Sequence, residues 1–152
     1  MDFKAISSKD NSLIKLVCAL QGSSSARKEH NLFVLEGLRI CDDACSCSIK
    51  FDKLIVSETA LLKYKEKVAK LSHNALECFR IPDSLFKKIS DTTSPQGVIA
   101  LCKMPSLNRQ IDPNGKYVAL ENINDPSNLG AVSRTAEALG VSGIILSANG
   151  CD

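Results

Sequence analysis

The sequence predicts an α/β protein in which helices pack on a sheet. Along residues 1–104, segments rich in strand-forming residues alternate with segments whose apolar residues recur at helical spacing. The chain is 44% apolar and 24% charged, a composition typical of a globular protein with a core. A polar stretch with two prolines then interrupts the alternation before a second unit begins.

The elements of the first unit follow in order. The first predicted helix starts at a cap provided by Ser8 or Asp10 and ends where Gly22 is followed by three serines. One face of this helix carries Leu13, Ile14, Val17 and Leu20. Further strands are predicted at residues 33–36, 53–56, 77–81 and 97–102, and further helices at residues 37–47, 57–71 and 84–90.

The second unit reads as one β-α-β segment, with strands at residues 117–121 and 143–147 and a helix at residues 129–139. We therefore expect one domain at residues 1–104, a linker at 105–115 and a second domain that begins at 116–152. A unit of about 45 residues with one helix buries too little apolar surface to stand alone. We expect this second domain to be incomplete.

Charge is divided unevenly along the chain. Residues 1–105 contain 16 Lys and Arg against 12 Asp and Glu, whereas residues 106–152 contain 3 against 5. A basic excess is compatible with a phosphate-backbone partner, although a solvated basic surface is the commoner explanation. The longest apolar runs are far shorter than a membrane helix of about 20 residues, and the N-terminus has no signal-peptide core. We expect a cytoplasmic protein.

The chain has seven cysteines, an odd number that favours reduced, packed thiols over a disulfide framework. Three of them, Cys41, Cys45 and Cys47, lie close together in sequence. Three thiolates can bind zinc, but no second ligand pair completes a tetrahedral site. A zinc-dependent interaction protein thus remains an alternative that rests on these cysteines alone.

Arg134 is the residue of the second unit that packing does not explain. The predicted buried stripe of its helix is formed by Leu129, Val132, Ala136 and Leu139. Arg134 faces away from that stripe, on nearly the same face as Ser127, so its guanidinium can fold back toward the helix start. The alternative is a surface pair with Glu137, worth about 0.3 kcal/mol.

The loop before this helix carries a recognisable motif. After Asp125-Pro126, the residues Asn128, Gly130 and Arg134 match the first motif of the SpoU/TrmH RNA 2′-O-methyltransferases, Asn-x-Gly-x-x-x-Arg. The first unit also resembles the substrate-binding domain of that family. The matching segments are Ile6 to Lys15, Arg27-Lys28, Phe33 to Arg39, and Thr93-Ser-Pro-Gln-Gly-Val98.

The resemblance implies a ribosomal-protein-like α/β RNA-binding domain followed by the first β-α-β part of a knotted, Rossmann-like SPOUT methyltransferase domain. It implies methyl transfer from S-adenosylmethionine to a ribose 2′-hydroxyl of RNA, ribosomal RNA more than transfer RNA, by a homodimer. The resemblance implies that Arg134 activates the ribose 2′-hydroxyl and that Asn128 holds the loop and the arginine in place. Asn124, Asp125, Ser127 and Asn128 are each candidates to cap the helix that follows. The later cofactor-gripping motifs have no counterpart before Asp152, so we expect the 152-residue chain alone to bind no cofactor and to be inactive.

Candidate RNA contacts in the first unit are cations and an exposed loop, because Lys and Arg meet phosphates. They are Lys15, Arg27, Lys28, Arg39, Thr93, Gln96 and Gly97. The rival hypothesis is a non-catalytic RNA-binding module in which the catalytic segment is inert. No function is expected of His30 or His73.

Overall fold

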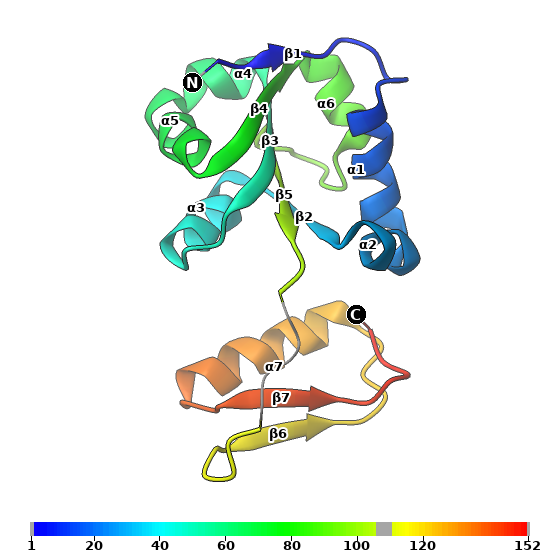
Figure 1. Ribbon diagram of the computed structural model, residues 1–152, viewed down its shortest axis with the longest axis vertical. Coiled ribbons are helices and arrows are strands. Elements are labelled where there is room, and N and C mark those ends of the chain that lie inside the picture. The colour runs from blue at the N-terminus through cyan, green and yellow to red at the C-terminus, as the bar shows by residue number, and fades with distance from the viewer. Residues whose placement is uncertain (1, 106–110, 152) are drawn as a thin grey trace. The chain divides into compact units, whose positions relative to one another are not determined.

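The computed structural model describes residues 2–105 and 111–151. The chain divides into two compact units, Met1–Pro105 and Ser106–Asp152 (Figure 1). The middle of the predicted linker, residues 106–110, lies outside the described residues. Within the described residues, no helix is long and apolar enough to cross a membrane.

The first unit is built on a mixed five-stranded sheet, with the strand order β1-β4-β3-β5-β2. The strands β1, β4 and β3 are parallel, while β5 runs antiparallel to both β3 and β2. The strands are β1 (Lys4–Ala5), β2 (Leu32–Glu36), β3 (Phe51–Ser57), β4 (Ala75–Ile81) and β5 (Val98–Lys103). The central strands β3 and β5 are almost entirely buried, as a sheet covered on both faces requires.

Helices cover both faces of this sheet (Figure 1). One core cluster joins the sheet to α3 (Leu38–Ser46), α4 (Glu58–Lys63) and α5 (Lys65–His73). The cluster on the other face joins it to α1 (Ser12–Gly22) and α6 (Asp83–Ile89), with α2 (Ser24–His30) beside α1. The helix that follows β3 and the helix that follows β4 therefore lie on opposite faces of the sheet.

Several predicted boundaries in this unit are wrong. The helix predicted at residues 57–71 is two helices, α4 and α5, which break at Tyr64. The serines after Gly22 end α1 as predicted, but Ser23 also caps α2 by accepting a hydrogen bond from the Ala26 amide. Asn11 caps α1, in place of Ser8 or Asp10. The two-residue strand β1 was not predicted.

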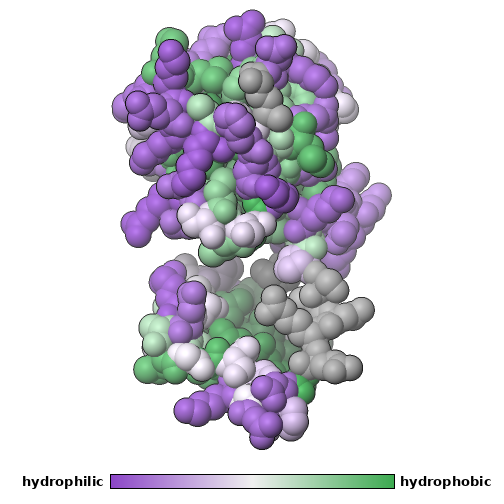
Figure 2. Space-filling view, turned by 60° about the vertical axis from the view of Figure 1, so that its left-hand side comes forward, coloured by the Kyte–Doolittle hydropathy of each residue, from purple (hydrophilic) through white to green (hydrophobic). Residues whose placement is uncertain are grey.

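The second unit is a β-α-β segment, β6 (Tyr117–Leu120), α7 (Pro126–Ala138) and β7 (Gly143–Leu146), with its two strands parallel. The helix begins at Pro126, three residues earlier than predicted, because Asp125 is the cap and proline suits the first helical turn. Of the predicted stripe, Ala136 is buried, whereas Leu139 is 73% exposed. Figure 2 shows apolar surface on this unit.

Candidate functional site

The loop between α6 and β5, residues 90–97, is held against the junction of β2 and α3. The Glu36 carboxylate accepts hydrogen bonds from the Ser90 hydroxyl, from the Asp91 amide at 3.0 Å and from the Thr92 hydroxyl at 3.0 Å. The Gly37 amide donates to the Val98 carbonyl at 2.9 Å. Two of the segments quoted for the resemblance, around Glu36 and around Pro95, thus form one structure.

Gln96 and Gly97 fix the far end of this loop. The Gln96 side chain accepts a hydrogen bond from the Leu38 amide at 2.8 Å, which satisfies a donor in the first turn of α3. Gly97 is buried with φ of +79°, and a Cβ there would lie 2.4 Å from Oγ of Ser57. Gly97 therefore shapes the loop, and its contact with RNA stays a prediction. Thr93 is exposed at the tip.

The predicted cationic contacts do not form one continuous face. Arg39 lies on α3, on one side of the sheet, with a side chain that is 94% exposed and 4.0 Å from Asp43. Lys15 on α1 and Lys28 on α2 belong to the opposite layer, and both are exposed. Residues 90–97 follow α6 of this layer and reach α3 of the other, since Gln96 accepts a hydrogen bond from the Leu38 amide.

Arg27, one of the predicted RNA contacts, stabilises the fold in this structure. Its Nη1 donates to the Leu20 carbonyl at 2.7 Å and to the Gln21 carbonyl at 3.4 Å. These are free carbonyls of the last turn of α1, where a cation is also favoured by the helix dipole. Arg27 thereby holds the corner between α1 and α2.

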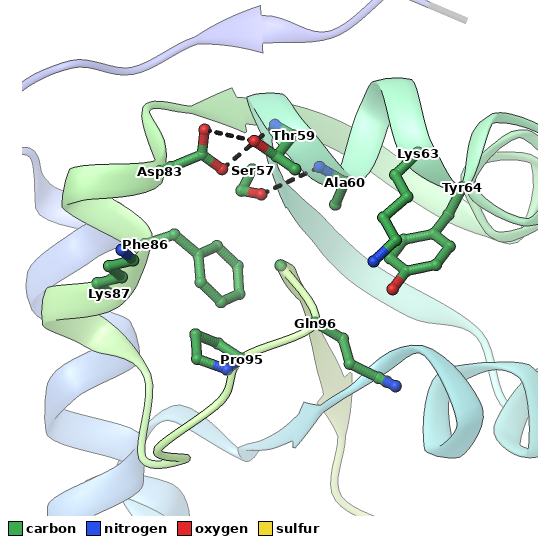
Figure 3. A pocket seen from close by; sticks show the side chains of 11 residues that line it. Ser57, Thr59, Ala60, Lys63, Tyr64, Asp83, Phe86, Lys87, Pro95 and Gln96 are labelled. Carbon is green, nitrogen blue, oxygen red and sulfur yellow. Dashed lines mark hydrogen bonds between the residues drawn. The ribbon is translucent and has the colours of Figure 1, made fainter.

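A cavity of about 320 Å³ opens at the carboxyl ends of β3 and β4 (Figure 3). Phe86 and Lys87 of α6 line one side with Pro95, and Lys63 and Tyr64 line the other. Gln96 and Gly97 of the predicted loop also line it. Lys63 and Tyr64 were not predicted, because they fall inside what the sequence suggested was a continuous helix.

The upper wall of the cavity is a hydrogen-bonded clamp between α4 and α6. The Asp83 carboxylate accepts from the Thr59 amide at 3.2 Å and from the Thr59 hydroxyl at 2.8 Å (Figure 3). Burial raises the pKa of Asp83, but the hydrogen bonds from Thr59 and Ser57 outweigh it, so the pKa lies below its ordinary value. Asp83 is thus ionised and fixed in the wall.

In the second unit, the loops after the two parallel strands are tied together. The Asn122 amide donates to the Ser147 hydroxyl at 2.8 Å, and the Cys151 amide donates to the Ile123 carbonyl at 2.8 Å. Asn122 adopts a left-handed conformation with φ of 53°, which asparagine tolerates. The loop that leads to α7 is therefore anchored at the carboxyl edge of the strands.

Arg134 folds back toward the start of α7. A Cβ built on Gly130 would lie 3.5 Å from Nη1 of Arg134, so the guanidinium lies over the glycine one turn earlier. Among the described residues, Arg134 makes no ion pair with Glu137. Asn128 is exposed within the first turn and is not the cap. The glycine leaves room for the arginine to reach the helix start.

The described residues offer no support for the zinc alternative. Within residues 2–105 and 111–151, no three His, Cys, Asp or Glu side chains converge on a common point. Burial raises the pKa of Cys41 to about 12 and that of Cys102 to about 11, so both thiols are protonated at neutral pH. No disulfide joins any of the seven cysteines, all of which lie in the described part of the chain.

Comparison with known proteins identifies the first unit. The family described as the MRM3-like substrate binding domain matches residues 11–100. The chain belongs to this family. The MRM3-like domain therefore spans α1 to β5 and includes the loop braced by Glu36 and every residue that lines the cavity.

Curated relatives extend the likeness into the second unit. A tRNA/rRNA methyltransferase of Synechocystis is 30% identical over 99% of this chain and 55% of its own length. The 23S rRNA (guanosine-2′-O)-methyltransferase RlmP of Bacillus subtilis is 27% identical over 79% of this chain and 45% of its own. The chain spans about half the length of these relatives.

Solved structures share the fold across both units. An AdoMet-bound rRNA methyltransferase from Sinorhizobium meliloti has a TM-score of 0.81 and 30% identity, and covers 99% of this chain and 56% of its own. The predicted α/β fold class is confirmed by this match. The SpoU methyltransferase AviRb from Streptomyces viridochromogenes, at 22% identity, has the same fold with a TM-score of 0.80.

Proposed function

We propose that this chain supplies the RNA-binding domain and the first catalytic segment of a ribosomal RNA ribose 2′-O-methyltransferase. The observation that carries the proposal is the folded-back Arg134 over Gly130, within the motif that the sequence resembles. Family membership of the first unit supports an RNA substrate. The non-catalytic alternative explains the first unit equally, but it assigns no role to the motif that contains Arg134.

The role proposed for Arg134 is stabilisation of negative charge at the ribose 2′-oxygen. A guanidinium has a pKa above 12 and cannot act as a base at neutral pH, whereas its fixed N–H groups suit a developing alkoxide. Asn128, exposed in the first turn of α7, is proposed to hold the loop and the arginine in place.

S-adenosylmethionine is the methyl donor proposed for the whole enzyme, since relatives of known structure bind it. The described residues of the second unit do not fit it by themselves. The groove beside α7 is lined by Val118, Ala131, Val132, Thr135, Ala136, Leu139 and Val141. The Thr135 hydroxyl there already donates to the Ala131 carbonyl at 3.0 Å. Cofactor binding is therefore assigned to the half of the relatives that this chain does not cover.

Assembly and location complete the proposal. Leu139, Ile145 and Leu146 are exposed apolar side chains, and such side chains are usually buried in an interface. The rest of a knotted catalytic domain and a second copy of the enzyme would bury them. The whole enzyme is therefore proposed to be a homodimer. A cytoplasmic location suits the seven free thiols, although a mitochondrial relative is known from Danio rerio.

The RNA-binding part of the proposal is tested with the 152-residue chain and a structured ribosomal RNA fragment. Affinity should fall as salt rises, because each phosphate contact adds about one unit to the log-log slope. Reversal of charge in Lys28→Glu with Arg39→Glu should flatten that slope by about two units. Lys116→Glu, in the second unit, is the control. An absence of binding at low salt, or an unchanged slope in the double variant, would contradict the proposal.

A further inference from the structure

The cavity at the carboxyl ends of β3 and β4 lies where the topology of the sheet opens a crevice. These neighbouring parallel strands are followed by helices on opposite faces, α4 and α5 after β3 and α6 after β4. In open α/β sheets, ligands bind where two such connections part. The cavity is lined from both connections and, in addition, from the loop before β5.

The lining is chemically mixed in a way that suits one kind of ligand. The charged lining residues are two exposed lysines, Lys63 and Lys87, and one acid, Asp83. Their net charge is +1. The acid is already bonded to Thr59 in the wall. The Tyr64 ring is half-buried, and Nζ of Lys63 lies 5.2 Å from its centroid. Phe86 is 1% exposed and closes the opposite side with Pro95 (Figure 3).

The break between α4 and α5 is what creates this arrangement. Tyr64 has φ of −118° and ψ of 36°, outside helical values, so the chain turns there. A continuous helix would give successive side chains a spacing of about 100° around one axis. The turn instead leaves Lys63 and Tyr64 on the same side of the cavity. A cation beside an aromatic ring is the usual combination for a phosphate with its attached base.

We propose that this cavity binds one unstacked nucleotide of the RNA substrate, with the base against Tyr64 and the phosphate between Lys63 and Lys87. The inference rests on the proposed function and names the substrate class of the domain more narrowly. A volume of about 320 Å³ admits a single small group and excludes a duplex, in which bases remain stacked. The domain therefore prefers a single-stranded or bulged segment next to the methylated region.

The test uses the 152-residue chain and a single-stranded RNA hexamer of mixed sequence. Lys63→Glu with Lys87→Glu should weaken binding at least about tenfold relative to Lys65→Glu with Lys67→Glu, which makes the same charge change on exposed positions of α5 outside the cavity. The same hexamer annealed to its complement should bind about tenfold more weakly than the single strand. Equal affinity of the two double variants would overturn the proposal, and so would equal affinity for duplex and single strand.

Tyr64 provides a second arm that separates stacking from charge. Tyr64→Phe keeps the ring and should bind as the parent does, whereas Tyr64→Leu should lose about tenfold, as expected for one stacked base. A lowered melting temperature in either Tyr64 variant would reveal a folding defect. In that case the comparison of the two lysine double variants alone tests the proposal. Tight binding of free adenosine or cytidine monophosphate, equal to that of the hexamer, would contradict an RNA segment as the occupant.

The outcomes also separate this inference from the proposed function. If structured ribosomal RNA binds and responds to Lys28 and Arg39 while the cavity variants change nothing, only the cavity assignment fails. If the chain binds no RNA of any kind at low salt, both fail.

Discussion

At the scale of single residues, Arg27 shows how a cation in a basic segment can serve the fold. It donates to two carbonyls at the end of α1 and so fixes the direction of α2. Arg27→Met keeps the apolar stem but leaves these carbonyls without a charged donor. We expect a loss of about 1.5 kcal/mol in the free energy of unfolding, measured by urea denaturation. Lys28→Met on the same helix should cost less than about 0.5 kcal/mol. Equal losses of stability in Arg27→Met and Lys28→Met would contradict the structural role of Arg27.

The start of α7 provides a second prediction at this scale. Asp125 accepts from the Ser127 amide at 2.8 Å and is the cap, whereas Asn128 lies inside the helix. Asp125→Ala should destabilise the helix by about 1 kcal/mol, and Asn128→Ala by less than about 0.5 kcal/mol. Hydrogen–deuterium exchange of the α7 amides measures both. A larger effect at Asn128 would return the cap to that residue, which is another of the candidates that the sequence offered.

At the scale of elements, a chain of charges crosses the edge of the sheet in the first unit. Glu77 of β4 pairs with Lys4 of β1 at 2.6 Å and with Lys53 of β3 at 2.9 Å. Hydrogen bonds from Lys4 and Lys53 lower the pKa of Glu77 from 4.5 to about 2. A carboxylate with a lowered pKa in the folded state contributes stability that is present above pH 4.5 and is lost as the pH falls toward 2.

The variant Glu77→Gln tests this coupling between the strands. The parent should lose stability between about pH 5 and pH 2, and the variant should lose less over that window because it has no such proton to take up. Denaturation midpoints across this range are the measurement. Parallel curves for parent and variant would show that Glu77 does not link the three strands. The weakened pairing should appear first at β1, which is two residues long.

The elements also indicate how far sequence reasoning reaches in this fold. Strands β2 to β7 and helices α1, α3, α6 and α7 were predicted, since local periodicity and caps specify them. The strand β1 was missed because its pairing with β4 joins residues far apart in the chain. The break at Tyr64 was missed because no glycine or proline marks it. Because the break was missed, Lys63 and Tyr64 were not predicted as cavity residues. The cavity depends on tertiary structure, which local sequence patterns do not specify.

The candidate site also contains features that the sequence predicts and features that only the structure reveals. Arg134 over Gly130 follows from helical spacing, so its direction was predictable. Arg27 and Gly97 were predicted as RNA contacts on composition and resemblance, but their hydrogen bonding and burial could be seen only once their neighbours were placed. The distribution of Arg39 and Lys28 over opposite layers depends on which face each helix covers.

At the scale of the whole molecule, the two units divide the work. The first has a core on each face of its sheet and is proposed to bind RNA, while the second presents Arg134 and exposed apolar side chains. The account depends on this arginine acting on the ribose hydroxyl. In an enzyme that also carries the half found in the relatives, Arg134→Ala should slow methyl transfer while leaving RNA affinity nearly unchanged.

The most direct measurement is single-turnover transfer of a tritiated methyl group to ribosomal RNA, with alkaline hydrolysis of the product. A 2′-O-methyl group blocks cleavage at its own phosphodiester, so the label should appear in an alkali-resistant dinucleotide. Arg134→Ala should reduce the rate by on the order of 10² to 10³, with Glu137→Ala as the matched control on the same helix. A rate for Arg134→Ala within about threefold of the parent, a difference of under about 1 kcal/mol, or label released by alkali as mononucleotides, would contradict the account.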